Sequence, residues 1–212
     1  MIIGVLIIGA VFLGLLTYRW TLALMRNKPE RALIYNLPIL LFPYLYLIGI
    51  AVVIRNDVNI DLIFPLLIYF IVFIGLIVGG AAAVLNINFY GSLSPKRGSW
   101  LSMMIKLIHI PAFIINFELA VMGLMMSIWG IGIIIFVSIV DLLTIIVSGT
   151  YALAAVMNMK KRGVIGTGIA AGLAVLSYLY CVDVIAAIVM FVLCRKHEKK
   201  VEMIVERYRA VE

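Results

Sequence analysis

Three acidic residues lie inside long apolar runs of this sequence. Glu118, Asp141 and Asp183 each have mostly aliphatic neighbours along the chain. An ionised side chain surrounded by lipid or by an apolar core costs several kcal/mol unless it has a partner. These acids are therefore the first candidates for a binding site, and carboxylates suit a cation, a proton or a polar solute.

The spacing of the acids predicts a common depth in a membrane. Glu118 and Asp141 flank the glycine-containing hairpin 127–132 at equal distances. At a rise of about 1.5 Å per residue, each lies about 12 Å from its ends. Asp183 precedes Leu193 by ten residues, or about 15 Å. We expect no Lys or Arg beside the three acids, so either some stay protonated or a cation lies among them. The alternative is structural, with each acid bonded to a Ser, Thr or Tyr of a neighbouring helix.

A polar stripe is predicted on a helix over residues 101–126. At about 100° per residue, five polar side chains fall within an arc of about 80°. They are Ser102, Lys106, His109, Asn116 and Ser127. Glu118 points to the opposite face, so this helix is expected in the interior of a bundle. Lys106 and His109 suit an anion or lipid headgroup, or a proton relay through His109. The alternative is a Lys106 side chain that reaches the membrane interface beside a hydrogen-bonded His109.

Other polar positions have a structural interpretation. A broader stripe on 133–157 consists of Ser138, Asp141, Thr144, Ser148 and Tyr151. Asn36 precedes Pro38 and is expected to support a helix kink. Gly75, Gly79 and Ala83 recur every four residues, a spacing that lets helices approach closely.

Several chemistries are absent from the sequence. It contains no His-Glu-x-x-His zinc motif, no glycine-rich phosphate loop and no Gly-x-Ser-x-Gly elbow. Asp141 and Asp183 do not follow Gly-x-Gly. The two cysteines indicate neither a disulfide framework nor a metal site. We therefore expect no enzyme, no cofactor, no catalytic residues and no metal ligands.

The composition predicts the elements that position these residues. Of 212 residues, 66% are hydrophobic and 13% charged, which leaves too few polar side chains to cover a soluble surface. We predict an all-α fold, a polytopic integral membrane helical bundle of about six transmembrane helices, with the lipid bilayer as its surroundings. The net charge of +7 lies mainly in short loops, which excludes a nucleic-acid partner. The expected spans are residues 2–24, 33–54, 62–85, 101–126, 133–157 and 165–193.

The loop charges predict the orientation and leave one conflict. The loops after the first, third and fifth spans are basic, whereas Asp57 and Asp61 follow the second. Basic loops stay on the cytoplasmic side, which puts the N-terminus outside. Six spans then put the charged tail, residues 195–212, outside as well, against the same rule. Either the segment 165–193 contains a re-entrant break or the tail is an exception. Its Val201, Ile204, Val205 and Tyr208 recur at helical spacing, which suggests an amphipathic helix on the membrane surface, with a solvated helix as the alternative.

Four short motifs lie between residues 104 and 190. They are 106–111 (Lys-Leu-Ile-His-Ile-Pro), Asp141 in its apolar run, Ser148-Gly149-x-Tyr151 and 181–185 (Cys-Val-Asp-Val-Ile). In these motifs the chain resembles a group of small, uncharacterised multi-spanning proteins of Gram-positive bacteria. The resemblance implies the cell membrane of a bacterium and no specific activity.

The leading functional hypothesis is a membrane component that binds or moves a small solute or cation. Its candidate site residues are Glu118, Asp141, Asp183, His109, Asn116 and Lys106. A second hypothesis is an accessory, immunity-type or structural subunit that docks onto another membrane protein or a second copy through a stripe of small residues. A third is an intramembrane enzyme, which would require a nucleophile in contact with a base.

Overall fold

The computed structural model describes residues 2–28, 31–44, 63–89 and 93–209, and all elements in these ranges are helices. The chain begins with α1 (Ile2–Asn27), the short α2 (Ala32–Tyr35) and a helical stretch at 37–44. Then follow α4 (Ile63–Phe89), α5 (Pro95–Met125), the 3₁₀ turn η3 (Ser127–Gly130), α6 (Ile131–Lys161), α7 (Thr167–Leu176) and α8 (Val182–Arg209). The expected all-α class is confirmed for the described part of the chain.

Within the described ranges, three helices are long and apolar enough to cross a membrane. They are residues 8–27 of α1, the whole of α5 and the whole of α6. Their outward faces carry large exposed apolar side chains such as Phe12, Phe117 and Leu142, as lipid contact requires. Shorter apolar helices occupy 74–87 and 167–176. Six spans are not confirmed, because much of the second expected span, together with Asp57 and Asp61, lies outside the described residues.

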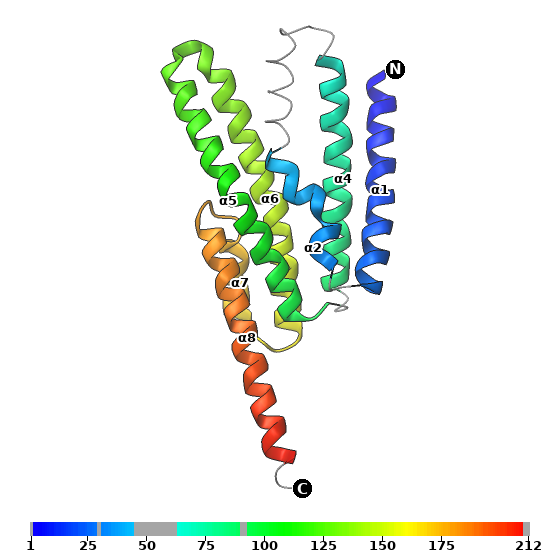
Figure 1. The fold of residues 1–212 in the computed structure, drawn as a ribbon, viewed down its shortest axis with the longest axis vertical. Coiled ribbons are helices and arrows are strands. Elements are labelled where there is room, and N and C mark those ends of the chain that lie inside the picture. Colours follow the sequence, from blue (N-terminus) through cyan, green and yellow to red (C-terminus); the bar gives the residue numbers. More distant parts are fainter. Residues whose placement is uncertain (1, 29–30, 45–62, 90–92, 210–212) are drawn as a thin grey trace.

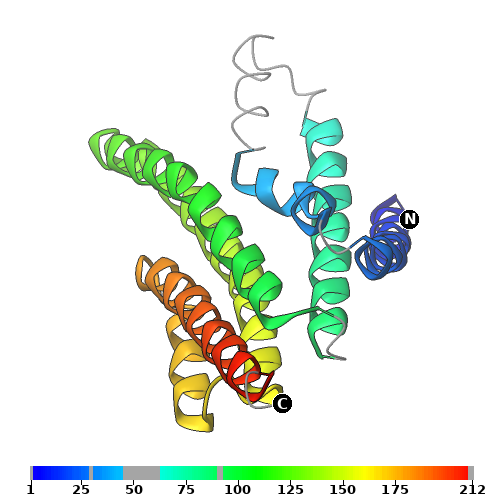
Figure 2. The same ribbon diagram turned by 60° about the horizontal axis from the view of Figure 1, so that its bottom comes forward.

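The last expected span is two helices instead of one. α7 ends at Leu176, residues 177–181 form a turn, and α8 runs back alongside α7 (Figures 1 and 2). Cys181 has a φ of 63° in this turn, and the Ser177 hydroxyl donates to the carbonyl of Leu173 at 2.7 Å. The expectation of one continuous helix over 165–193 is wrong, and the segment contains the break that was its alternative. No glycine or proline lies at 173–193 to indicate that break.

The charged tail continues α8 without interruption to Arg209. Residues 201–209 are all exposed, and the four apolar positions that recur at helical spacing are among them. At the start of the tail, Glu198 forms an ion pair of 2.7 Å with Lys96 of α5. The tail therefore leaves the bundle beside the first turn of α5 (Figure 1).

Packing arranges the helices in a row. α4 lies between α1 and α6, while α5 packs on α6 and on α8 (Figure 2). Two glycines of α4, Gly75 and Gly79, face α1: a Cβ on Gly79 would collide with the backbone of Gly14. One core cluster, which includes Ile39, Ile77, Ile105 and Tyr151, joins α4, α5 and α6 to the 37–44 stretch. A second joins α6, α7 and α8.

Candidate functional site

The predicted polar stripe of α5 faces the interior of the bundle. Ser102, Lys106, His109 and Asn116 are each 0–1% exposed. The four residues are spaced by four, three and seven positions along α5. Each of these spacings returns to the same side of a helix, so their side chains share one face. Ser127 does not belong to the stripe, because α5 ends at Met125 and Ser127 is exposed in the η3 turn.

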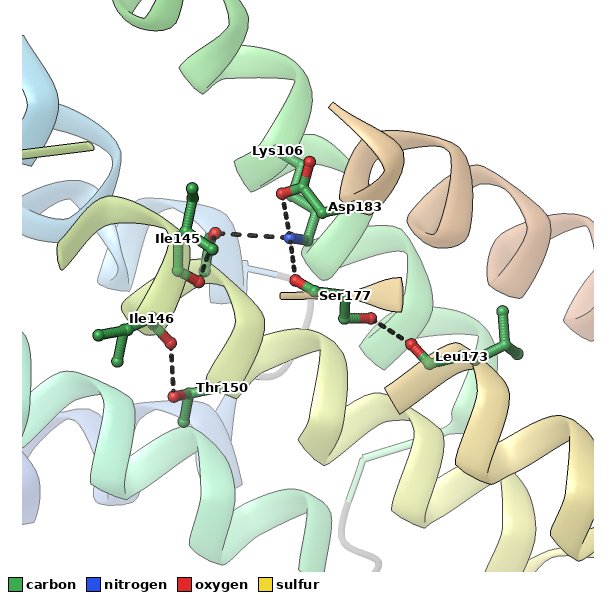
Figure 3. A network of polar contacts seen from close by, with 8 residues as sticks. Lys106, Ile145, Ile146, Thr150, Leu173, Ser177 and Asp183 are labelled. Atoms are coloured by element: carbon green, nitrogen blue, oxygen red, sulfur yellow. Dashed lines mark hydrogen bonds and ion pairs between the residues drawn. The ribbon is translucent and has the colours of Figure 1, made fainter. Parts of the chain in front are cut away.

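An ion pair between Lys106 and Asp183 lies at the centre of the site. The Nζ atom of Lys106 is 2.5 Å from Oδ2 of Asp183, and the two side chains are 1% and 3% exposed. The same ammonium donates to the carbonyl of Ser177 at 3.1 Å and to the hydroxyl of Ser148 at 3.5 Å (Figure 3). Lys106 thus meets oxygen atoms from α6, from the 177–181 turn and from α8.

Two expectations about these residues are corrected. Asp183 has a lysine beside it, and Lys106 does not extend to the membrane interface. The expectation for Asp183 treated residues 165–193 as one straight helix, and that for Lys106 rested on its place near one end of the 101–126 span. The turn at 177–181 instead brings Asp183, in the first turn of α8, to the level of Lys106.

The break between α7 and α8 suits both charges. The Ser177 carbonyl that Lys106 contacts lies at the C-terminal end of α7, where the helix dipole is negative. Asp183 lies at the N-terminal end of α8, where the dipole is positive. Each half-helix end therefore favours the charge that it meets.

Asp141 has a different partner. Asn116 of α5 donates its side-chain N–H to Oδ1 of Asp141 on α6, which is half-buried. Asn116 lies ten residues beyond Lys106, or about 15 Å along α5. Glu118 is exposed on the outer face of α5. The three acids therefore do not form one site, and no cluster of three metal-ligating side chains occurs among the described residues.

His109 and Asn36 hold the 37–44 stretch and α2 against the bundle. His109 Nε2 lies 3.1 Å from the carbonyl of Ile39, whereas its Nδ1 is buried without a hydrogen-bond partner in the described chain. Asn36 donates to the carbonyl of Ala32 at 2.6 Å and accepts from the Tyr151 hydroxyl at 2.6 Å. Asn36 thus forms hydrogen bonds within the chain at the point where α2 ends.

A groove of about 570 Å³ opens beside the ion pair, between α5 and the start of α8. The residues that line it are apolar except for Tyr180, Cys181 and Asp183. The edge of Phe113 packs on the Tyr180 ring, with centroids 5.2 Å apart. The lining residues are Ile110, Phe113, Ile114, Phe117, Tyr180, Cys181, Asp183, Val184 and Ile185.

Sequence reasoning missed Ser177 and Tyr180. Ser177 contributes its backbone carbonyl, an atom that every residue has, so its type carries no signal. Tyr180 reaches the groove only because the chain turns at 177–181, and no residue pattern marks that turn.

No protein-family model matches the sequence, and neither the curated proteins nor the solved structures contain a significant match.

Proposed function

We propose that this chain is a membrane component that binds a small solute in the groove between α5 and α8 and serves in its movement. The buried Lys106–Asp183 pair carries the proposal. Taking two charges out of water costs several kcal/mol per ion, and apolar residues of similar volume often stabilise a fold equally well. A buried pair beside a groove is therefore better explained by recognition than by stability.

The break between α7 and α8 supports this function. In membrane transporters, interrupted helices supply charged and backbone groups that bind solutes inside the bilayer. Here the interruption brings a helix end, a carboxylate and an ammonium within hydrogen-bond distance of one another.

The groove favours a solute with an apolar body and an amino group. Its aliphatic and aromatic walls accept hydrocarbon, and Asp183 at its wall accepts a hydrogen bond from an ammonium group. Such a group would share or take over the carboxylate that Lys106 holds. Lys106 would keep its contacts with Ser177 and Ser148.

The proposal is tested with three probes that share a six-carbon chain. The purified full chain in detergent is mixed with hexylammonium, hexanol or hexanoate, and binding is measured by calorimetry and by the shift in melting temperature. Hexylammonium is expected to bind most tightly. Asp183→Asn is expected to weaken that binding about tenfold, the effect of losing one charge-assisted hydrogen bond. Asp141→Asn, at the other paired acid, is the matched control and should change it little.

Two outcomes would overturn the proposal. Tighter binding of hexanoate would make Lys106 the recognising group and exclude an amine. Binding of none of the probes, in a protein that remains folded, would remove the groove as a solute site.

The packing favours neither of the other two hypotheses, a docking subunit and an intramembrane enzyme. A docking subunit was expected to expose its stripe of small residues, but Gly75 and Gly79 pack against α1. An enzyme requires a base that accepts a proton. Lys106 lies 3.5 Å from the Ser148 hydroxyl, yet it donates to Asp183 and so offers Ser148 no lone pair.

We also propose an orientation in which the N-terminus lies outside the cell and the tail inside. The proposed location of the protein is the cell membrane of a bacterium. The end of α1, the start of α5 and the end of α6 all carry basic residues. With α7 and α8 as a re-entrant hairpin, the basic tail is on that same side. The conflict in the loop charges then disappears.

A further inference from the structure

A basic cleft lies at the opposite end of α5 from the hairpin 127–132. It is bounded by the first turns of α5, the end of α6 and residues 191–202 of α8. Two adjoining hollows of about 640 and 500 Å³ share Lys96, Arg162 and Glu198. The solute groove described above includes none of these residues.

The charges of the larger hollow favour an anion. Its walls contain Lys96, Arg97 and Arg162 against one carboxylate, that of Glu198. Arg162 is oriented by bonds to the side chain of Asn158 at 3.3 Å and to the carbonyl of Leu93 at 3.5 Å. Gathering three cations in one hollow is repulsive, and a phosphate that bonds to ammonium and guanidinium groups relieves this repulsion.

The apolar walls and the position of the cleft specify the kind of anion. Trp100 and Phe191 line the same hollow as the cations. The cleft lies where α5 begins and α6 ends, and both helices are long and apolar enough to cross a membrane. For helices that cross it, these ends lie at the boundary of the membrane. A tryptophan beside basic residues is typical of that boundary. A ligand that carries a phosphate on a hydrocarbon body matches both parts of the wall.

We propose that this cleft binds the headgroup phosphate of an anionic phospholipid. Arg97 and Arg162 contact the phosphate, and Trp100 and Phe191 contact the lipid chain below it. Glu198 competes with the phosphate for Lys96, because Glu198 and Lys96 form an ion pair of 2.7 Å. This competition would distinguish the cleft from the rest of the basic surface.

The test measures binding of phosphatidylglycerol to the full chain in phosphatidylcholine nanodiscs. Arg97→Gln with Arg162→Gln is expected to weaken binding about tenfold or more, since each arginine supplies a charge-assisted hydrogen bond. Glu198→Gln is expected to tighten it, because the competing carboxylate is gone. Lys199→Gln with Lys200→Gln is the matched control. It removes the same charge from exposed positions of the adjoining tail and should leave binding within about twofold.

Three results would overturn the proposal. An equal loss in the cleft and control variants would reduce the effect to general attraction between charges. An unchanged or weaker affinity in Glu198→Gln would contradict the competition. Displacement of the lipid by millimolar inorganic phosphate would identify a soluble phosphate ligand instead. Helix content and melting temperature of each variant in phosphatidylcholine alone verify that it is folded.

Discussion

At the scale of single residues, the central feature is a lysine and an aspartate that neutralise each other away from water. Their side chains are 1% and 3% exposed, whereas the side chains of the Lys96–Glu198 ion pair are 48% and 39% exposed. Removing one partner of a buried pair leaves an uncompensated charge, and removing both does not. The two pairs therefore respond differently to the same substitutions.

We expect strong coupling within the buried pair. Asp183→Asn and Lys106→Met should each reduce the free energy of unfolding by about 3–5 kcal/mol, and the double variant should lose much less than their sum. Unfolding in a single detergent measures this. Lys96→Met and Glu198→Gln form the control cycle, with a coupling of at most about 1 kcal/mol. Additive losses at the buried pair would contradict the contact.

At the scale of the elements, the packing of the α7–α8 turn against α6 depends on a glycine. A Cβ on Gly149 would lie 2.5 Å from the Cε1 atom of Tyr178, the residue that follows Ser177 in the turn. The missing side chain lets the turn approach α6 closely enough for Ser148 and Ser177 to share the Lys106 ammonium. Because the glycine belongs to α6 and the ring to the turn after α7, the sequence around either residue alone does not indicate their contact.

Gly149→Ala is expected to push the turn away from α6 and to destabilise the fold by about 1–3 kcal/mol through overpacking. Gly132→Ala on the same helix is the control. Nothing lies within 4 Å of a Cβ there, so alanine should stabilise the helix by up to about 1 kcal/mol. Thermal unfolding of both variants measures the difference. Equal stabilities would mean that the turn does not pack on α6.

At the scale of the whole molecule, the charged residues are concentrated at one end. The basic ends of α1 and α6, the start of α5 and the charged tail lie at the same end in Figure 1. The opposite end, around η3, carries exposed apolar residues such as Ile128. This asymmetry supports the proposed orientation, in which the proposed lipid cleft lies in the inner leaflet.

Cysteine labelling in whole cells tests this orientation. In a background of Cys181→Ser and Cys194→Ala, a cysteine at Glu206 in the tail and one at Gly163 after α6 should both resist a membrane-impermeant maleimide. A cysteine at Ser127, in the hairpin between α5 and α6, should react. All three should react after the cells are opened. Labelling of Glu206→Cys in intact cells would place the tail outside and exclude a re-entrant hairpin.

The sequence by itself determined the all-α membrane class, the hairpin at 127–132 and the buried stripe of α5. These follow from apolar length and helical period, which act over neighbouring residues. Tertiary structure alone decided which charges meet. Asp183 pairs with Lys106 because the chain reverses at 177–181, and no local pattern marks that reversal. Glu118 points outward while Asn116, two residues away, meets Asp141, so equal depth did not imply contact. Contact between side chains of two helices depends on the orientation of each helix about its axis and on the crossing angle. Packing between residues distant in the chain determines both.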